Sequence, residues 1–250
     1  MTTPLTHTTL SLVVVALLAS AAEAHARPTT QPRQQSGADA ALRFEWELSW
    51  VQVFGLPNQA VQLRVNRALV AEVARERSEM RRHLRDWEPT GGYASTLDAG
   101  MTVGVLTDEL LSVTVSSSTM YSGAARPNHS LRTVTFDLRT GSKVPAAALL
   151  QPGAGARAAA LVDAKLRADP DYSEGGEYYL APVRPEHLTG ILVERDGLRF
   201  LFGDQQLGPH AVGLPETKLT WAELDGVVAR DGAIARHVAR SAGLTGALRR

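Results

Sequence analysis

The chain has 250 residues, of which 44% are hydrophobic and 21% charged, a composition typical of a globular protein with a substantial core. The number of lysines and arginines equals the number of aspartates and glutamates, so the protein has no net charge that would attract it to nucleic acid or to an anionic membrane. Cysteine is absent, which excludes disulfides, thiolate nucleophiles, cysteine-based zinc sites and a lipidated cysteine. Partners must therefore be recognised by local surface chemistry.

Residues 1–26 predict a secretory signal peptide. The apolar run from Leu10 to Ala19 is too short to cross a bilayer comfortably, and the small residues after it fit cleavage after Ala24 or Ala26. No later segment is apolar enough to span a membrane, so we expect a secreted or periplasmic protein with no membrane contact after cleavage. Because no lysine or arginine precedes the apolar run, an uncleaved N-terminal anchor or a misassigned start codon is the alternative.

The rest of the chain divides into three parts. Residues 27–41 carry prolines, glutamines and threonines with almost no large apolar side chain, which predicts a disordered leader. Residues 42–229 predict one folded domain. Residues 230–250 predict a basic, weakly amphipathic C-terminal helix or tail, for which packing, fraying and a partner contact all remain open.

Hydrophobic periodicity gives the elements of the domain. Phe44, Trp46, Leu48 and Trp50 alternate with polar residues and predict a strand with one buried face. After it, Asn58 is placed to cap a helix with an apolar residue every four positions: Val61, Val65, Leu69 and Val73. Arginines on the opposite face of this helix are interleaved with glutamates, which favours a solvated surface over a nucleic-acid site.

The second half of the domain continues in strands. Alternating apolar residues predict strands at 101–105, 111–115 and 134–138, with Gly141 in the turn that follows and a loop from Tyr121 to Asn128 between the last two. A short helix is expected at 158–168, and Asp196-Gly197 predicts a hairpin. Thr220 and Glu223 have the spacing of a capping box, which predicts a helix opening at Trp221. Together these elements predict an α+β single domain: an antiparallel β-sheet with helices packed on one face.

Three segments, in order, resemble the extracytoplasmic domain shared by RsiV-like anti-sigma factors and PdaC-like peptidoglycan deacetylases, a domain of unknown function. The segments are 47–69 with its Gly-Leu pair, the Tyr121–Asn128 loop with Phe136-Asp137-Leu138-Arg139-Thr140-Gly141, and 198–224 with Leu207-Gly208-Pro209-His210. This chain has Ala124 and Arg126 where the family loop has a glycine and a histidine. The resemblance covers about Phe44 to Val227 and leaves the leader and the C-terminal helix outside.

The resemblance implies a non-catalytic binding domain of the cell envelope, with a lysozyme-like muramidase or peptidoglycan as partner. The candidate binding residues are amphipathic or turn-forming side chains of the loop and of the closing segment: Tyr121, Gly123, Arg126, Pro127, Asn128 and His210. The alternative is that Tyr121 and Pro127 pack beneath the loop and Asn128 caps a turn.

No cofactor, metal site or catalytic residue is predicted. No histidine pair has the i, i+4 spacing of a zinc site, and no Gly-x-Ser-x-Gly nucleophile motif occurs. Acidic pairs such as Asp169 with Asp171 lie in one loop, which favours solvation over a glycosidase pair. The alternatives to a binding protein are a cell-wall hydrolase or esterase with unrecognised carboxylates, and a structural envelope component.

Overall fold

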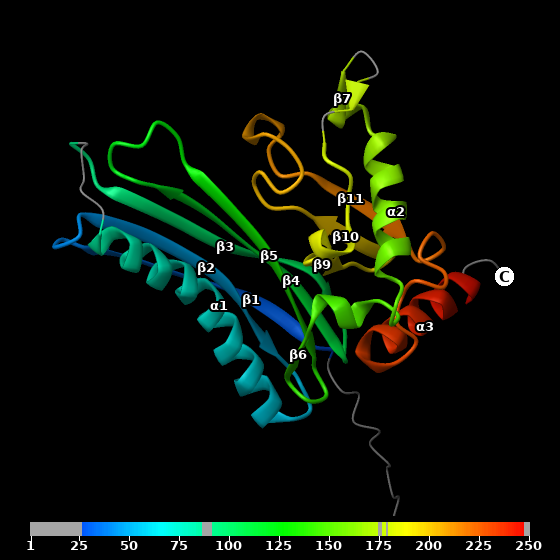
Figure 1. Cartoon of the computed structure of the whole chain (residues 1–250). Helices are drawn as coiled ribbons and strands as arrows, with labels where there is room; N and C mark the ends of the chain where they lie inside the picture. Colours follow the sequence, from blue (N-terminus) through cyan, green and yellow to red (C-terminus); the bar gives the residue numbers. More distant parts are fainter. Residues whose placement is uncertain (1–26, 87–91, 175–176, 179, 248–250) are drawn as a thin grey trace, which may run out of the picture.

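The structure is a computed structural model that describes residues 27–86, 92–174, 177–178 and 180–247. The predicted signal peptide lies outside these residues. Within the described part, no helix is long and apolar enough to span a membrane. The α+β class is confirmed: a six-stranded sheet carries one long helix on one face and a second layer, with its own three-stranded sheet, on the other (Figure 1).

The first layer is the six-stranded sheet in the order β1-β2-β3-β4-β5-β6. Neighbouring strands are antiparallel except β2 and β3, which run parallel because the long helix α1 carries the chain back between them. The bounds are β1 Thr29–Asp39, β2 Phe44–Phe54, α1 Gln59–Arg85, β3 Ser95–Leu106, β4 Leu110–Met120, β5 Asn128–Asp137 and β6 Ser142–Val144.

Helix α1 begins where the sequence predicts. The Asn58 side chain accepts hydrogen bonds from the backbone amides of Ala60 at 2.9 Å and Val61 at 3.2 Å, which satisfies two amides of the first turn. The predicted apolar stripe is buried against the sheet, with Val65 and Leu69 fully enclosed. The stripe meets Phe44, Leu97 and Phe136 in a core that lies between α1 and the sheet.

The predicted disordered leader is wrong, because residues 29–39 form strand β1. Every residue of β1 pairs with β2, from Thr29 with Phe54 to Asp39 with Phe44. Gly37 lies under the ring of Trp46, where an added Cβ would come 2.4 Å from the indole. Strand β1 lies at the edge of the sheet, and most of its side chains are exposed and polar. This composition resembles that of a disordered segment, although the whole strand is paired with β2.

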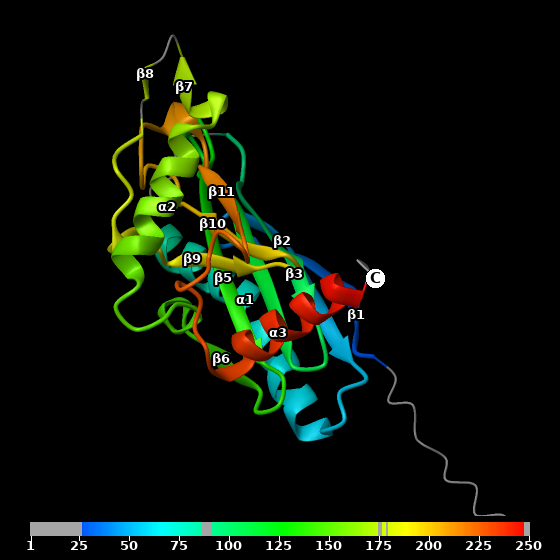
Figure 2. The same cartoon turned by 90° about the vertical axis from the view of Figure 1, so that its right-hand side faces the viewer.

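The second layer has its own core and packs on the face of the first sheet that α1 leaves free. Its three-stranded sheet has the order β11-β10-β9, and helices α2 and α3 cover it (Figures 1 and 2). The bounds are η1 Ala146–Leu149, α2 Gly155–Arg167, η2 Pro170–Tyr172, β7 Ser173–Glu174, β8 Glu177–Tyr178, η3 Pro185–His187, β9 Gly190–Val193, β10 Gly197–Leu201, η4 His210–Val212, β11 Glu216–Thr220 and α3 Gly232–Ala247.

The predicted hairpin joins β9 to β10, but its two turn residues are Arg195 and Asp196. The amide of Glu194 donates to the carbonyl of Gly197 at 3.0 Å, so Gly197 is already in the ladder. Its glycine is needed there because an added Cβ would come 2.1 Å from the carbonyl oxygen of Leu219.

The capping box at Thr220 forms, but the helix predicted at Trp221 is wrong. The amide and hydroxyl of Thr220 both donate to Glu223 Oε2 at 2.8 Å, and the Glu223 amide donates back to the Thr220 hydroxyl at 3.3 Å. Residues 221–227 nevertheless form only turns, ending near Gly226 with φ +70°. The chain then pairs with residues 149–151, and these hydrogen bonds replace those of a helix.

The C-terminal helix is packed for at least its first half. Ile234 is 2% and His237 5% exposed, and both lie against the second layer. Arg236 forms ion pairs with Glu109 and with Asp137, which lie at the ends of β4 and β5, and so ties α3 to the first sheet.

Candidate functional site

Strand β9 crosses the first sheet and leaves part of its face uncovered. The amide of Ile191 donates to the hydroxyl of Thr133, and that of Val193 to the hydroxyl of Ser112, both at 3.0 Å. At the same crossing Gly104 lets β9 come close, since an added Cβ would lie 2.6 Å from Leu192 Cγ. These contacts identify the side of β3, β4 and β5 that faces the second layer.

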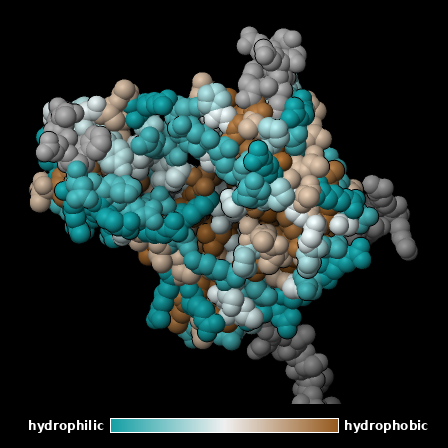
Figure 3. All heavy atoms as spheres, viewed as in Figure 1, coloured by the Kyte–Doolittle hydropathy of each residue, from teal (hydrophilic) through white to brown (hydrophobic). Residues whose placement is uncertain are grey.

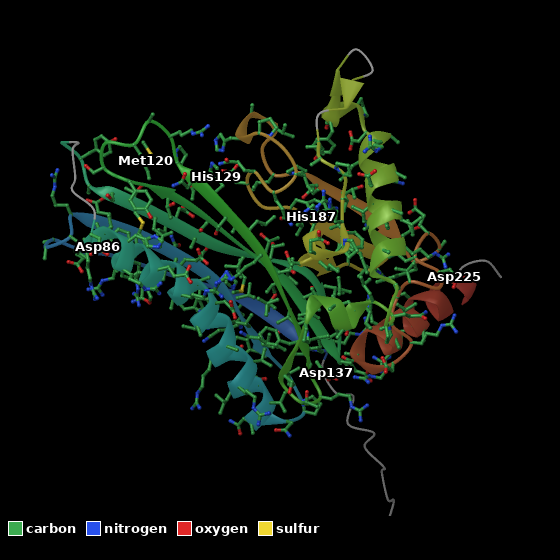
Figure 4. All side chains as sticks on the ribbon, in the orientation of Figure 1. Asp86, Met120, His129, Asp137, His187 and Asp225 are labelled. Atoms are coloured by element: carbon green, nitrogen blue, oxygen red, sulfur yellow. The ribbon has the colours of Figure 1, made fainter. Side chains whose placement is uncertain are left out.

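Side chains alternate along a strand, so the same side continues beyond the crossing toward the free end of the sheet. From Thr133 to His129 it extends for four residues of β5, or about 13 Å at strand spacing. We call this surface the open sheet face. Its members are Glu45, Glu47, Ser49, Thr96, Asp98, Gly100, Thr102, Thr114, Ser116, Ser118, His129 and Leu131. Figure 4 shows His129 and Met120 at this free end, with Asp137 at the other end of the sheet.

The open sheet face carries negative charge. Glu45 and Glu47 alternate on β2, and Asp98 is the register partner of Glu47 on β3. All three are exposed, and none of the described strand positions on this face holds lysine or arginine. Like charges on directly paired positions repel, so Glu47 and Asp98 are an unfavourable pair for the isolated sheet. The remaining members are mostly hydroxyl-bearing or glycine, and Figure 3 shows hydrophilic colour over this projecting part of the molecule.

Tyr121, a predicted binding residue, points away from the open sheet face. Its hydroxyl lies 3.1 Å from Nδ1 of His83 on α1, and its ring packs against the core beneath that helix. Burial raises the pKa of the Tyr121 hydroxyl above its ordinary value. This placement agrees with the alternative in which the tyrosine supports the loop from below.

The rest of the loop is held by Tyr93 and Ser95. Gly123 has φ +91° and donates its amide to the Tyr93 hydroxyl at 3.0 Å, which in turn donates to the carbonyl of Ala124 at 3.3 Å. The buried Ser122 donates its amide to the Ser95 hydroxyl at 2.9 Å. The loop conformation is therefore fixed by side chains that the sequence analysis did not single out.

Within the loop, Arg126 and Asn128 are exposed and Pro127 is half-buried. Asn128 opens β5 and pairs with Thr119, so its backbone belongs to the sheet while its side chain reaches solvent. Arg126 and Asn128 thus remain available for a partner at the free end of the sheet, next to the open sheet face.

His210, the last predicted binding residue, lies in the second layer, in the loop between β10 and β11. Its Nδ1 is 2.8 Å from both carboxylate oxygens of Asp204, which fixes the orientation of the ring. The neighbouring Gln206 accepts from the amide of Gly203 at 2.8 Å and donates to the carbonyl of His187 at 2.9 Å, so this loop is also ordered by its own side chains. His210 and the Tyr121–Asn128 loop thus belong to different layers of the molecule.

The described residues contain no group of three or more His, Cys, Asp or Glu side chains placed to hold a metal ion. Ser117 donates to Glu76 on the α1 side at 2.9 Å, whereas Ser116 and Ser118 lie on the open sheet face, and no histidine is bonded to any of them in the described part. The described residues thus form a polar surface bordered by loops that side-chain hydrogen bonds hold in place.

Comparison with known proteins gives a fold and no function. No family model matches the chain, and no curated protein matches its sequence. Among solved structures, the chain is similar to a DUF3298 family protein from Bacteroides fragilis, with 12% identity, a TM-score of 0.63 and coverage of 84% of this chain and 96% of that one. It is also similar to a DUF3298 family protein from Pseudomonas aeruginosa, with 14% identity, a TM-score of 0.53 and coverage of 81% and 94%. At these identities the likeness shows a shared fold.

Proposed function

We propose that this chain is an extracytoplasmic binding protein of the RsiV-like type, and that its open sheet face engages a basic, lysozyme-like muramidase. Peptidoglycan is the second partner that the sequence resemblance implies. The fold of DUF3298 family proteins is consistent with such a domain. The single observation that carries the proposal is the group of exposed carboxylates Glu45, Glu47 and Asp98 on a face without a described lysine or arginine.

The charge of this face suits a cationic protein better than a glycan. Complementary potentials steer association and select against partners of the same sign. Glu47 and Asp98 also oppose each other across paired strands, and a basic side chain placed between them would relieve that repulsion. Arg126 and Asn128, at the edge of the face, supply hydrogen-bond donors for the rim of such an interface.

Binding of a purified lysozyme to the purified protein tests the proposal, measured by calorimetry at two salt concentrations. The double variant Glu47→Lys with Asp98→Lys removes two attractive charges and adds two repulsive ones. At about 0.5 kcal/mol for each exposed interaction this amounts to about 2 kcal/mol, or roughly a 30-fold weaker Kd. Added salt is expected to weaken binding of the unchanged protein and to have less effect on the variant.

The matched control changes charge elsewhere. Glu186→Lys reverses an exposed carboxylate in η3 of the second layer, whose nearest basic partner, Arg184, is 3.9 Å away. Its lysozyme affinity should equal that of the unchanged protein. Equal loss of affinity in both variants, or no lysozyme binding at all, contradicts the proposal; retention on peptidoglycan without lysozyme binding assigns the face to the glycan.

The oriented His210–Asp204 pair favours a catalytic alternative, because a carboxylate that fixes an imidazole is also found in general-base sites. A cell-wall hydrolase or esterase would release product from peptidoglycan, and His210→Gln would abolish the release. A binding protein retains its partner without ever forming product, so a turnover assay separates the two functions.

A further inference from the structure

The outward side of helix α1 carries a line of exposed arginines. Exposed residues recur along it every three or four positions, the spacing that keeps side chains on one side of a helix. We call this line the arginine ridge, and its members are Arg64, Arg67, Ala71, Arg75, Ser78, Arg82 and Arg85. From its first to its last arginine the ridge is about 32 Å long at the rise of an α-helix. Figures 1 and 2 show α1 on the side of the first sheet away from the second layer.

Two glutamates that are interleaved with these arginines in the sequence point inward in the structure. Glu72 is buried and Glu76 half-buried. The guanidinium of Arg132 on β5 lies 3.1 Å from Glu72 and 3.0 Å from Glu76, and Lys143 on β6 also pairs with Glu72. The first sheet thus neutralises these two carboxylates, and they do not offset the charge of the ridge.

Most arginines of the ridge have no carboxylate partner in the described part of the chain. The third glutamate of α1, Glu79, pairs with Arg75 at 2.7 Å. Arg64 donates to the carbonyl of Thr140 at 2.7 Å, which leaves its charge in place. The other arginines of the ridge have neither a hydrogen bond nor an ion pair with described residues: Arg67, Arg82 and Arg85.

The zero net charge of the chain therefore conceals a separation of charge across the first sheet. The carboxylates of the open sheet face lie on one side, and the arginine ridge lies on the outside of α1 on the other. A helix with its side chains is about 10–12 Å thick, which exceeds the Debye length of about 8 Å at physiological salt. An anionic surface that approaches α1 thus meets the positive charge without the negative one.

The shape and the apolar content of the ridge favour a lipid surface over other anions. The ridge is convex, so a flat surface can contact its whole length. The carboxylates of the open sheet face span only about 7 Å, so those of a second copy can meet only one pair of its arginines. Leu63 lies one turn before Arg67 and is 48% exposed, one of two large apolar side chains that are exposed among the described residues. A leucine gains free energy on entering a headgroup region but gains none from a polyanion in water.

We propose that the arginine ridge docks helix α1 on the surface of an anionic lipid bilayer, with Leu63 entering the headgroup region. The arginines pair with lipid phosphates, and the protein lies on the bilayer without crossing it. The proposal does not depend on the function proposed for the open sheet face, which points away from the bilayer in this orientation. Export, as predicted from residues 1–26, would bring the chain next to such a surface.

Sedimentation of the full chain with lipid vesicles tests the proposal. Vesicles of phosphatidylcholine mixed with phosphatidylglycerol present the anionic surface. Vesicles of phosphatidylcholine alone give the baseline, because apolar insertion of any segment needs no charged headgroup. We expect binding to the mixed vesicles above this baseline and weaker binding as salt is added. The triple variant Arg67→Gln, Arg82→Gln and Arg85→Gln should bind about 100-fold more weakly, since each arginine near the surface contributes about fivefold.

The matched control replaces three exposed arginines of the second layer: Arg157→Gln, Arg184→Gln and Arg230→Gln. It changes the net charge by the same amount and should bind the mixed vesicles as the unchanged protein does. Leu63→Ser separates lipid from a soluble polyanion, because it should weaken vesicle binding several-fold and leave binding of polyphosphate unchanged. Binding no stronger than the baseline, equal losses in the two triple variants, or an unchanged vesicle affinity of Leu63→Ser overturns the proposal.

Discussion

The contact between the two layers can be tested at Gly104 with an unusually close control. A Cβ added at Gly104 would lie 2.6 Å from Leu192 Cγ, 2.7 Å from its Cδ1 and 2.7 Å from the carbonyl oxygen of Val193. The leucine can rotate, but the carbonyl belongs to the backbone of β9, so β9 must move by about 1 Å to reach an ordinary contact distance. Such overpacking costs about 1–3 kcal/mol.

Gly100 lies on the same strand and the same side but beyond the crossing, on the open sheet face. A Cβ there meets only the Ser49 hydroxyl, at 3.1 Å. Replacement of a strand glycine by alanine gains about 0.5 kcal/mol from the unfolded state, so Gly100→Ala should be neutral or slightly stabilising.

Urea unfolding of Gly104→Ala and Gly100→Ala, followed by tryptophan fluorescence, measures the difference. We expect Gly104→Ala to lose about 2 kcal/mol of unfolding free energy relative to Gly100→Ala. Equal midpoints for the two variants would refute both the close crossing of β9 and the assignment of the uncovered face.

Three further predictions concern charged and titrating groups. Arg132→Met removes the guanidinium that lies 3.1 Å from the buried Glu72 and 3.0 Å from Glu76; because Lys143 still pairs with Glu72, the change should cost about 2 kcal/mol in urea unfolding. Burial holds the pKa of His237 below its ordinary 6.5, so the unfolded chain takes up the proton at a higher pH than the folded protein does. The unfolding free energy should therefore fall as the pH drops below about 6.5. In His237→Phe, titrated in parallel, the contribution of His237 to this pH dependence should vanish. The Thr220 hydrogen bonds hold the pKa of Glu223 at about 2 instead of 4.5, so its stabilising effect should be lost only between those pH values, and Glu223→Gln should lose it at every pH.

The sequence was sufficient to predict an element where its capping residue and its pattern of apolar residues indicate the same structure. Asn58 and the apolar stripe after it predicted the start and the buried face of α1, and the alternation from Phe44 predicted β2. Both elements bury one face against the same core, so the spacing of apolar residues within each segment was enough to predict its type and its buried face.

Elsewhere the outcome depends on contacts that are distant in sequence. The polar residues of β1 become a strand only because β2 offers them a full ladder of partners. The capping box at Thr220 is satisfied, yet the backbone after it pairs with residues 149–151 instead of continuing as a helix. No local pattern contains that information, because the partner residues lie 5 to 25 positions away for β1 and 76 to 80 positions away for the segment after Thr220.

The candidate site was predicted in part for the same reason. The residue types of the Tyr121–Asn128 loop and of His210 marked them as candidate binding residues. The direction in which Tyr121 points could not be predicted, because it depends on His83, which lies on a helix 38 residues earlier. The carboxylates Glu45 and Glu47 were visible as the polar half of an alternating strand. Their pairing with Asp98 was not, because it requires the parallel register of β2 and β3.

A net charge of zero therefore says little about which partners this protein can attract. Glu45 and Glu47 are two strand residues apart, about 7 Å, and Glu47 and Asp98 occupy paired positions on strands about 5 Å apart. Both spacings are shorter than the Debye length of about 8 Å at physiological salt. The electrostatic potentials of Glu45, Glu47 and Asp98 therefore add at this surface. Because the fields of more distant basic residues are screened, a cation approaching the open sheet face meets these carboxylates first, and its binding should weaken as salt shortens that length.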